Sequence, residues 1–184
     1  MRLGQCLESA PDLIVTTGGV SVGAFDFVKE VFGRVGGAID FWKVRMKPGK
    51  PLAFGLMGTP PLFGLPGNPV SCMVNFLQFV RPWIRKSLGT PNAFLPVVPA
   101  TAGCAFRERP GRASFVRVTL VVGPNGWIAE STGSQSSGVL TSMARAHGFL
   151  LLDEHSSGVG PGDPVRVQLF DSSFLDGGVP AYPW

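Results

Sequence analysis

The first half of the chain alternates short apolar runs with turns and with longer amphipathic stretches. The apolar runs at residues 13–17, 39–44, 51–57 and 62–65 have strand length and are bounded by Gly, Pro or polar residues. Residues 25–35 place Phe and Val at helical spacing, and Asn68-Pro69 opens a longer apolar-periodic stretch that ends near Gly89. The alternation predicts an α/β domain, with Asn68 or Ser71 capping the long helix and Pro82 kinking or breaking it.

Beyond Thr90-Pro91 the pattern changes to short strands separated by Gly, Ser and Pro turns. The strand-like runs cover residues 94–98, 115–122, 127–130, 149–152 and 165–170, and residues 137–146 have the pattern of one short helix. Such a series is typical of a small all-β barrel or sandwich. We therefore expect an α/β domain over residues 1–90, a β domain over residues 91–170 and a loose Gly/Pro-rich tail over residues 171–184.

Composition excludes several classes of protein. With 184 residues and 45% hydrophobic content the chain is able to bury a core. No apolar run is long enough to cross a bilayer and the first residues do not form a signal peptide, so we expect no membrane partner and a cytoplasmic location. The net charge of +4 favours anionic partners, but Lys and Arg are scattered, which disfavours nucleic acid. Three widely spaced cysteines favour neither a disulfide framework nor a paired-cysteine zinc site.

A glycine loop follows the first predicted strand. Asp12-Leu13-Ile14-Val15 leads directly into Thr16-Thr17-Gly18-Gly19-Val20-Ser21-Val22-Gly23, and a predicted helix comes next. Glycines allow backbone N–H groups to approach an anion closely, and the helix adds its unpaired N-terminal amides. The alternative is a tight turn without a ligand.

Two further loops have complementary chemistry. The sequence Lys47-Pro48-Gly49-Lys50-Pro51 holds two ammonium groups on one proline-rich turn, which is unfavourable when empty and favourable around an oxyanion. The sequence Gly64-Leu65-Pro66-Gly67-Asn68-Pro69-Val70-Ser71 joins a strand to a helix. A solvated basic turn and simple helix caps are the alternatives. Strand-end loops of one sheet converge at its carboxyl edge, where open α/β sheets bind ligands.

The motifs together resemble those of the molybdopterin molybdotransferases, to which the E domain of gephyrin is similar. The resemblance rests on residues 16–23, 26–29, 46–51 and 64–71, then on Gly111-Arg112 with Phe115 and Arg117, and on residues 130–137 and 140–143. Order and spacing match from about Pro11 to Leu169. The resemblance implies a partial three-layer molybdopterin-binding-type α/β domain followed by a β-barrel domain.

The resemblance also implies a reaction. Adenylylated molybdopterin and molybdate would be the substrates, and the adenylate would be cleaved with a divalent ion such as Mg²⁺ while molybdate enters the dithiolene. By motif, the implied molybdate pocket consists of Lys47, Lys50, Pro51, Ser71, Arg112 and Ser137. The implied cofactor-binding residues are Thr17, Gly18, Gly19, Ser21, Gly23, Pro66, Gly67 and Asn68. Asp26 and Lys50 would be catalytic, with Asp26 also the metal ligand.

Several of these residues have a simpler interpretation. Asp26 lies near a helix start, where a carboxylate is stabilising in any case. Arg112 and Arg117 flank a strand and are alternatively exposed edge charges, and Ser137 is alternatively a helix cap. His147 and His155 have no ligand spacing.

Two departures from the family pattern open a second hypothesis. Ala24 stands where the family usually has Asp or Glu, and family members are much longer, with further domains on the amino side. The chain is thus either an enzyme, or its carboxyl-terminal part, or a truncated, non-catalytic molybdopterin- or molybdate-binding module or scaffold fragment. Small anionic substrates are the expected ligands, and a homodimer or an amino-terminal partner chain is the expected assembly.

Overall fold

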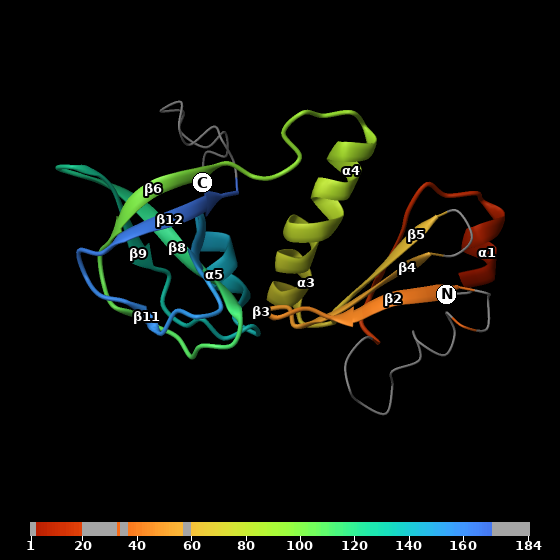
Figure 1. The fold of residues 1–184 in the computed structure, drawn as a ribbon, viewed down its shortest axis with the longest axis horizontal. Helices are drawn as coiled ribbons and strands as arrows, with labels where there is room; N and C mark the ends of the chain where they lie inside the picture. Colours follow the sequence, from red (N-terminus) through yellow and green to blue (C-terminus); the bar gives the residue numbers. More distant parts are fainter. Residues whose placement is uncertain (1–2, 20–32, 34–36, 57–59, 171–184) are drawn as a thin grey trace. The chain divides into compact units, whose positions relative to one another are not determined.

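The structure is a computed structural model that describes residues 3–19, 33, 37–56 and 60–170 (Figure 1). It divides into two compact units, Met1–Arg81 and Pro82–Trp184. The domain limits expected at residues 90 and 170 stay predictions. Among the residues that the structure describes, no helix is long and apolar enough to cross a membrane.

The first unit contains a mixed four-stranded sheet. Its strand order is β1 (Ile14–Thr17), β5 (Pro61–Leu65), β4 (Pro51–Leu56) and β2 (Ala38–Lys43). Strand β1 is parallel to β5, whereas β4 is antiparallel to both β5 and β2. Strands β1, β2 and β5 therefore run in one direction, and their carboxyl ends share one edge of the sheet.

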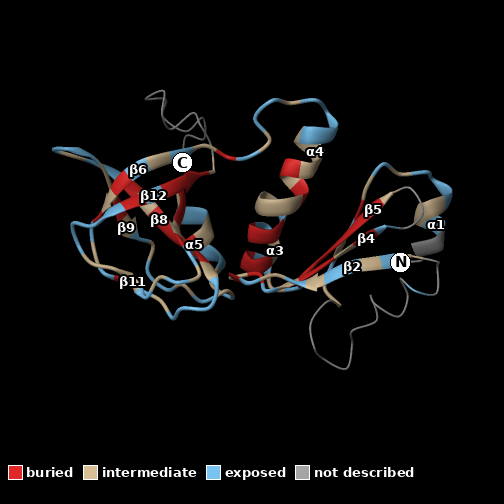
Figure 2. Ribbon diagram, viewed as in Figure 1, coloured by how far each residue is buried: buried red, intermediate tan, exposed pale blue. Residues whose placement is uncertain are grey.

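The core of this sheet follows β5, which is buried along its whole length (Figure 2). Phe54 of β4 packs between Phe41 and Phe63, with ring centroids 5.3 and 4.9 Å away. Helix α1 (Leu3–Glu8) contributes Leu7 to a cluster with Ile14 and Leu62. The short strand β3 (Met46–Lys47) lies between β2 and β4 in the chain. The helix expected over residues 25–35 lies outside the described residues, apart from Gly33.

The long helix expected after Asn68 is present, in three consecutive segments. These are α3 (Pro69–Asn75), the π-helical turn η1 (Phe76–Val80) and α4 (Arg81–Ser87). Pro82 does not end the helix: the Arg81 N–H bonds to the Phe76 carbonyl just before it, and this wider turn accommodates a residue that lacks a donor. Asn68 occupies the N-cap position without a side-chain capping bond, and Ser71 lies inside α3, so the capping prediction is wrong for both residues.

The second unit is a closed five-stranded barrel, as predicted. Strands β10 (Gly148–Leu152), β12 (Pro164–Leu169), β6 (Val97–Ala102), β9 (Gly126–Ser131) and β8 (Ala113–Gly123) follow one another, and β8 pairs back with β10. All these pairs are antiparallel except β6 with β9. Two short strands, β7 (Phe106–Arg107) and β11 (Gly158–Val159), form a separate pair, and helix α5 (Leu140–Arg145) packs against β8.

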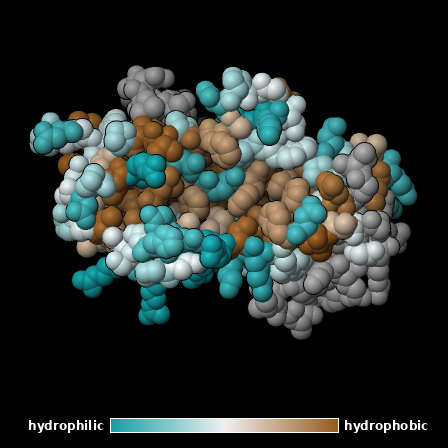
Figure 3. Space-filling view, in the orientation of Figure 1, coloured by the Kyte–Doolittle hydropathy of each residue, from teal (hydrophilic) through white to brown (hydrophobic). Residues whose placement is uncertain are grey.

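Alternate residues of the barrel strands fill its interior. The buried cluster includes Val116, Val118, Leu120, Leu150, Val167 and Leu169. Hydrophobic residues also gather on the visible face of this unit, with hydrophilic side chains around them (Figure 3). The strand expected over residues 94–98 begins only at Val97, because Pro96 has no N–H for a ladder and contributes only its carbonyl, to the N–H of Leu169.

Candidate functional site

The carboxyl edge of the four-stranded sheet brings together the described parts of all three loops. The Gly18 N–H donates to the Leu65 carbonyl at 2.9 Å, so the glycine loop leaves β1 beside the end of β5. Lys43 at the end of β2 lies opposite Pro51 at the start of β4, so the basic turn closes at this same edge. The predicted convergence is confirmed for these segments.

The two glycine-containing loops approach each other closely. Gly18 and Gly19 have φ of +84° and +70°, in the left-handed region that favours glycine. A Cβ on Gly67 would lie 3.4 Å from the Gly18 Cα. The backbones at Gly18 and Gly67 are therefore close together, and the role of these glycines in exposing backbone N–H groups to an anion stays a prediction.

Three buried oxygens near this edge lack a hydrogen-bond partner in the part of the chain that the structure describes. They are Thr16 Oγ1 on β1, Asn68 Oδ1 before α3 and Asn75 Oδ1 beside the basic turn. A buried polar atom without a partner costs about 1–3 kcal/mol, which a ligand donor offsets. All three oxygens are able to accept hydrogen bonds, so the edge suits a polar ligand that carries N–H or O–H groups.

The basic turn is held in one conformation by its neighbours. Gly49 has a φ of +104°, and the Val44 N–H donates to the Lys50 carbonyl at 3.0 Å. Asn75 Nδ2 donates to the carbonyls of Gly49 and Pro51 at 3.1 and 3.0 Å. The Lys50 side chain is exposed. The turn therefore presents an ammonium group from a fixed backbone.

Asn75 was not selected by sequence reasoning. It is fully buried at the end of α3, next to the equally buried Val74. The sequence does contain one signal for Asn75, which is an amide side chain among the apolar positions of a predicted helix. Such a group needs hydrogen-bond partners when it is buried. Ser71 is also buried and lies four residues before Asn75, so both share one face of the helix.

The remaining members of the predicted pocket belong to the barrel unit. Arg112 is exposed immediately before β8, after Gly111, whose N–H donates to the Glu154 carbonyl at 2.6 Å. Ser137 is half-buried in the segment before α5. The predicted meeting of these two residues with Lys47 and Lys50 joins the two units and stays a prediction.

Hydrogen bonds to Arg117 hold the segment before Ser137 against β8. The Gln135 amide accepts the Arg117 N–H at 2.9 Å and donates to the Arg117 carbonyl at 3.0 Å. The Arg117 guanidinium in turn donates to the carbonyls of Ser134 and Ser136 at 3.4 and 3.1 Å. Arg117 is fully buried, and burial lowers the pKa of its side chain. The interpretation of Arg117 as an exposed edge charge is therefore wrong.

The predicted metal site lies beyond the described residues. Asp26, Ser21, Gly23 and Ala24 all belong to the segment that the structure does not describe. Within residues 3–19, 33, 37–56 and 60–170 there is no group of three His, Cys, Asp or Glu that would hold a metal ion. Magnesium therefore stays a prediction. His147 has a structural contact, because its Nδ1 accepts the Leu120 N–H at 2.9 Å.

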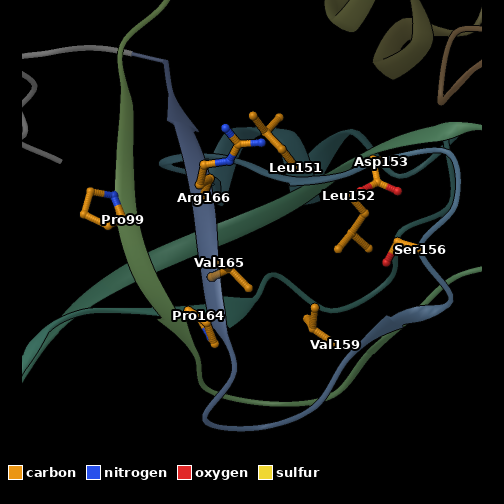
Figure 4. A pocket seen from close by; sticks show the side chains of 9 residues that line it. All are labelled: Pro99, Leu151, Leu152, Asp153, Ser156, Val159, Pro164, Val165 and Arg166. Carbon is orange, nitrogen blue, oxygen red and sulfur yellow. The ribbon is translucent and has the colours of Figure 1, made fainter.

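A hollow of about 370 Å³ in the barrel unit does not coincide with any predicted site residue (Figure 4). Its apolar lining includes Leu152, Val159 and Val165. Two of its polar groups are already engaged locally: Asp153 accepts the His155 N–H, and the Ser156 hydroxyl bonds to Gly158. The third polar lining residue, Arg166, is exposed, and none of the three was predicted to bind a ligand.

Both parts of the chain match known protein families. Residues 3–86 match a probable molybdopterin binding domain, and residues 99–170 match the MoeA C-terminal region, domain IV. A molybdopterin molybdenumtransferase of Haemophilus influenzae is 37% identical over 89% of this chain and 41% of its own length. Molybdopterin molybdenumtransferase 2 of Mycobacterium tuberculosis is 36% identical over 85% of this chain and 39% of its own.

The fold agrees with these relatives. The crystal structure of a molybdopterin biosynthesis moeA protein from Pyrococcus horikoshii OT3 matches with a TM-score of 0.68 and 27% identity, over 91% of this chain and 39% of that one. The chain thus spans about two fifths of the length of the relatives it matches. The chain thus carries a probable molybdopterin binding domain followed by the MoeA C-terminal region, and over this span it is similar to the molybdopterin molybdenumtransferases.

Proposed function

We propose that the chain takes part in the insertion of molybdenum into adenylylated molybdopterin, the last step of molybdenum-cofactor biosynthesis. The observation that supports this most directly is the shared sheet edge, where the glycine loop, the basic turn and the Pro66–Asn68 segment meet. A cradle of backbone amides beside ammonium groups suits a phosphorylated pterin together with a small oxyanion. The relatives named molybdopterin molybdenumtransferase support the same assignment.

Each pocket residue has a role that follows from its chemistry. The cations of Lys47, Lys50 and Arg112 compensate the charge of the tetrahedral molybdate dianion, and Arg112 offers a planar fork of donors. The hydroxyls of Ser71 and Ser137 donate to molybdate oxygens, and Pro51 shapes the turn. The loop from Thr17 to Gly23 faces the pterin and its phosphate.

A divalent metal ion and a larger assembly are also part of the proposed function. Asp26 would hold Mg²⁺, which supplies charge neutralisation for cleavage of the adenylate. We propose a homodimer or an amino-terminal partner chain as the assembly, and a cytoplasmic location.

Isothermal titration calorimetry with molybdate tests the pocket. The intact chain is compared with Lys50→Ala and Arg112→Ala, which we expect to weaken binding by tenfold or more, because each removes a cation from beside a dianion; tenfold is about 1.4 kcal/mol. Lys86→Ala and Arg109→Ala are matched controls, since both side chains are exposed outside the predicted pocket. Equal heats for the intact chain and both pocket variants would rule out the pocket.

A non-catalytic binding module is the second candidate. Ala24 favours it, because the resemblance implies an acid at this position. The discriminating assay follows cleavage of adenylylated molybdopterin by the chain, with and without the amino-terminal half of a relative. Turnover in either condition eliminates the purely binding role, and binding without turnover in both supports it.

A further inference from the structure

Asn75 connects the helix after the third loop with the basic turn. We propose that Asn75 is a positioning residue for the oxyanion site at Lys47–Pro51, an inference that rests on the proposed function. Its side chain is fully buried, and its Nδ2 reaches the carbonyls on both sides of Lys50, at 3.1 Å from Gly49 and 3.0 Å from Pro51. One amide thus fixes the backbone on either side of the lysine.

The carbonyl of Lys50 itself is held by a different donor. It accepts the Val44 N–H at 3.0 Å. Three successive carbonyl oxygens, of Gly49, Lys50 and Pro51, are therefore all engaged by donors of this protein. A carbonyl oxygen carries partial negative charge and repels an oxyanion, so a turn that binds one gains from having these oxygens directed elsewhere.

The same bonds orient the amide of Lys50. In a trans peptide the C=O and N–H point in opposite directions. Because the Gly49 carbonyl points to Asn75, the N–H of Lys50 is turned to the side away from Asn75. Asn75 in this way directs a backbone donor, and not a backbone acceptor, away from the protein interior. A tetrahedral oxyanion that approaches Lys50 meets that donor.

Gly49 and Asn75 form a steric pair. A Cβ on Gly49 would lie 2.9 Å from Asn75 Oδ1 and 3.2 Å from both its Cγ and its Nδ2. Gly49 also has a φ of +104°, where an L side chain is strained. A methyl group at position 49 therefore displaces the Asn75 amide without any change to Asn75, which provides a second, independent way to break the same contact.

The test combines two measurements on the full chain. Hydrogen exchange of the Val44 amide reports whether the Lys50 carbonyl stays in place, and calorimetry reports molybdate affinity. Asn75→Ala, Asn75→Asp and Gly49→Ala are the test variants. Asn75→Asp keeps the shape but replaces the donor with an acceptor. Val74→Ala is the control, because Val74 is equally buried beside Asn75 but is absent from the bonds that hold the turn.

We expect the three test variants to raise the Val44 exchange rate and to weaken molybdate binding by about tenfold or more, which is the size of one lost hydrogen bond to a charged ligand. Val74→Ala is expected to lower the unfolding temperature and to leave both other readouts unchanged. The positioning role is refuted by unchanged Val44 exchange, by faster exchange at full molybdate affinity, or by an equal loss of affinity in Val74→Ala. A failure of the proposed function appears differently, as absence of molybdate binding by the intact chain, and it removes the anion role of Asn75 as well.

Discussion

At the residue scale, the Gln135 side chain makes the pair of main-chain hydrogen bonds that a neighbouring strand would otherwise make. Its amide makes both the donor and the acceptor contact to the Arg117 main chain. Gln135→Ala leaves these groups in a part-buried place, and we expect a loss of about 1–3 kcal/mol in the free energy of unfolding. Urea denaturation measures this loss. Asn125→Ala, in the exposed turn between β8 and β9, is the control with little change expected, and equal midpoints for the two variants would contradict the prediction.

Cys72 provides a second prediction at the residue scale. Burial raises the pKa of its thiol, so at mildly alkaline pH less thiolate is present in the folded chain than in the unfolded one. Because the thiolate is the nucleophile, alkylation of Cys72 by iodoacetamide is expected to be slower in the folded protein than in urea. Mass spectrometry of the Cys72 peptide measures both rates. Equal rates would contradict this assignment.

Single residues show where sequence reasoning reaches its limit. The basic turn is recognisable in the sequence because Lys47 and Lys50 are close neighbours separated by Pro and Gly. Asn75 binds carbonyls 26 and 24 residues away, and Gln135 binds a residue 18 away. Such contacts depend on how elements pack, and a pattern of polar and apolar positions contains no information on partners at that separation.

At the scale of elements, the long strands and the long helix were predictable and the shortest elements were not. Apolar or alternating runs of strand length identify β8, β10 and β12, and helical spacing identifies the helix from Pro69 to Ser87. Strands β3, β7 and β11 have two residues each, too few for any periodicity. They exist because tertiary neighbours pair with them, as Gly158 and Val159 do with β7.

The β7–β11 pair yields a prediction about glycine. Gly158 has a φ of +118°, and a Cβ there would overlap the Phe106 carbonyl oxygen of the paired strand. Gly162 has a φ of +86° but nothing within 4 Å of its Cβ position. Gly158→Ala is therefore expected to destabilise the barrel by more than Gly162→Ala, whose cost is the backbone strain of about 1–2 kcal/mol. Thermal unfolding of both variants measures the difference. Identical midpoints would show that the two strands separate without cost.

For the whole molecule, the sequence predicted an α/β unit followed by a β-barrel because periodicity and turn spacing change near Pro91. Which groups from the two units share one ligand is a different question, since it depends on their arrangement and not on the pattern within either. The predicted molybdate pocket draws Lys50 from the first unit and Arg112 from the second. Molybdate-binding free energies of single and double variants test whether Lys50 and Arg112 contact the same ion.

A double-mutant cycle on molybdate binding provides this measurement. If Lys50 and Arg112 contact the same dianion, the loss in Lys50→Ala/Arg112→Ala differs from the sum of the single losses, with a coupling of about 0.5–3 kcal/mol. Lys50→Ala/Arg109→Ala is the matched cycle, because Arg109 is an exposed arginine close to Arg112 in the chain, and its effects are expected to add. Raising the salt concentration separates contact from long-range attraction, because exposed charges are screened over about 10 Å at 0.1 M ionic strength whereas groups sharing one bound ion are screened less. Additive losses in both cycles would contradict a shared dianion and would mean that Lys50 and Arg112 act independently.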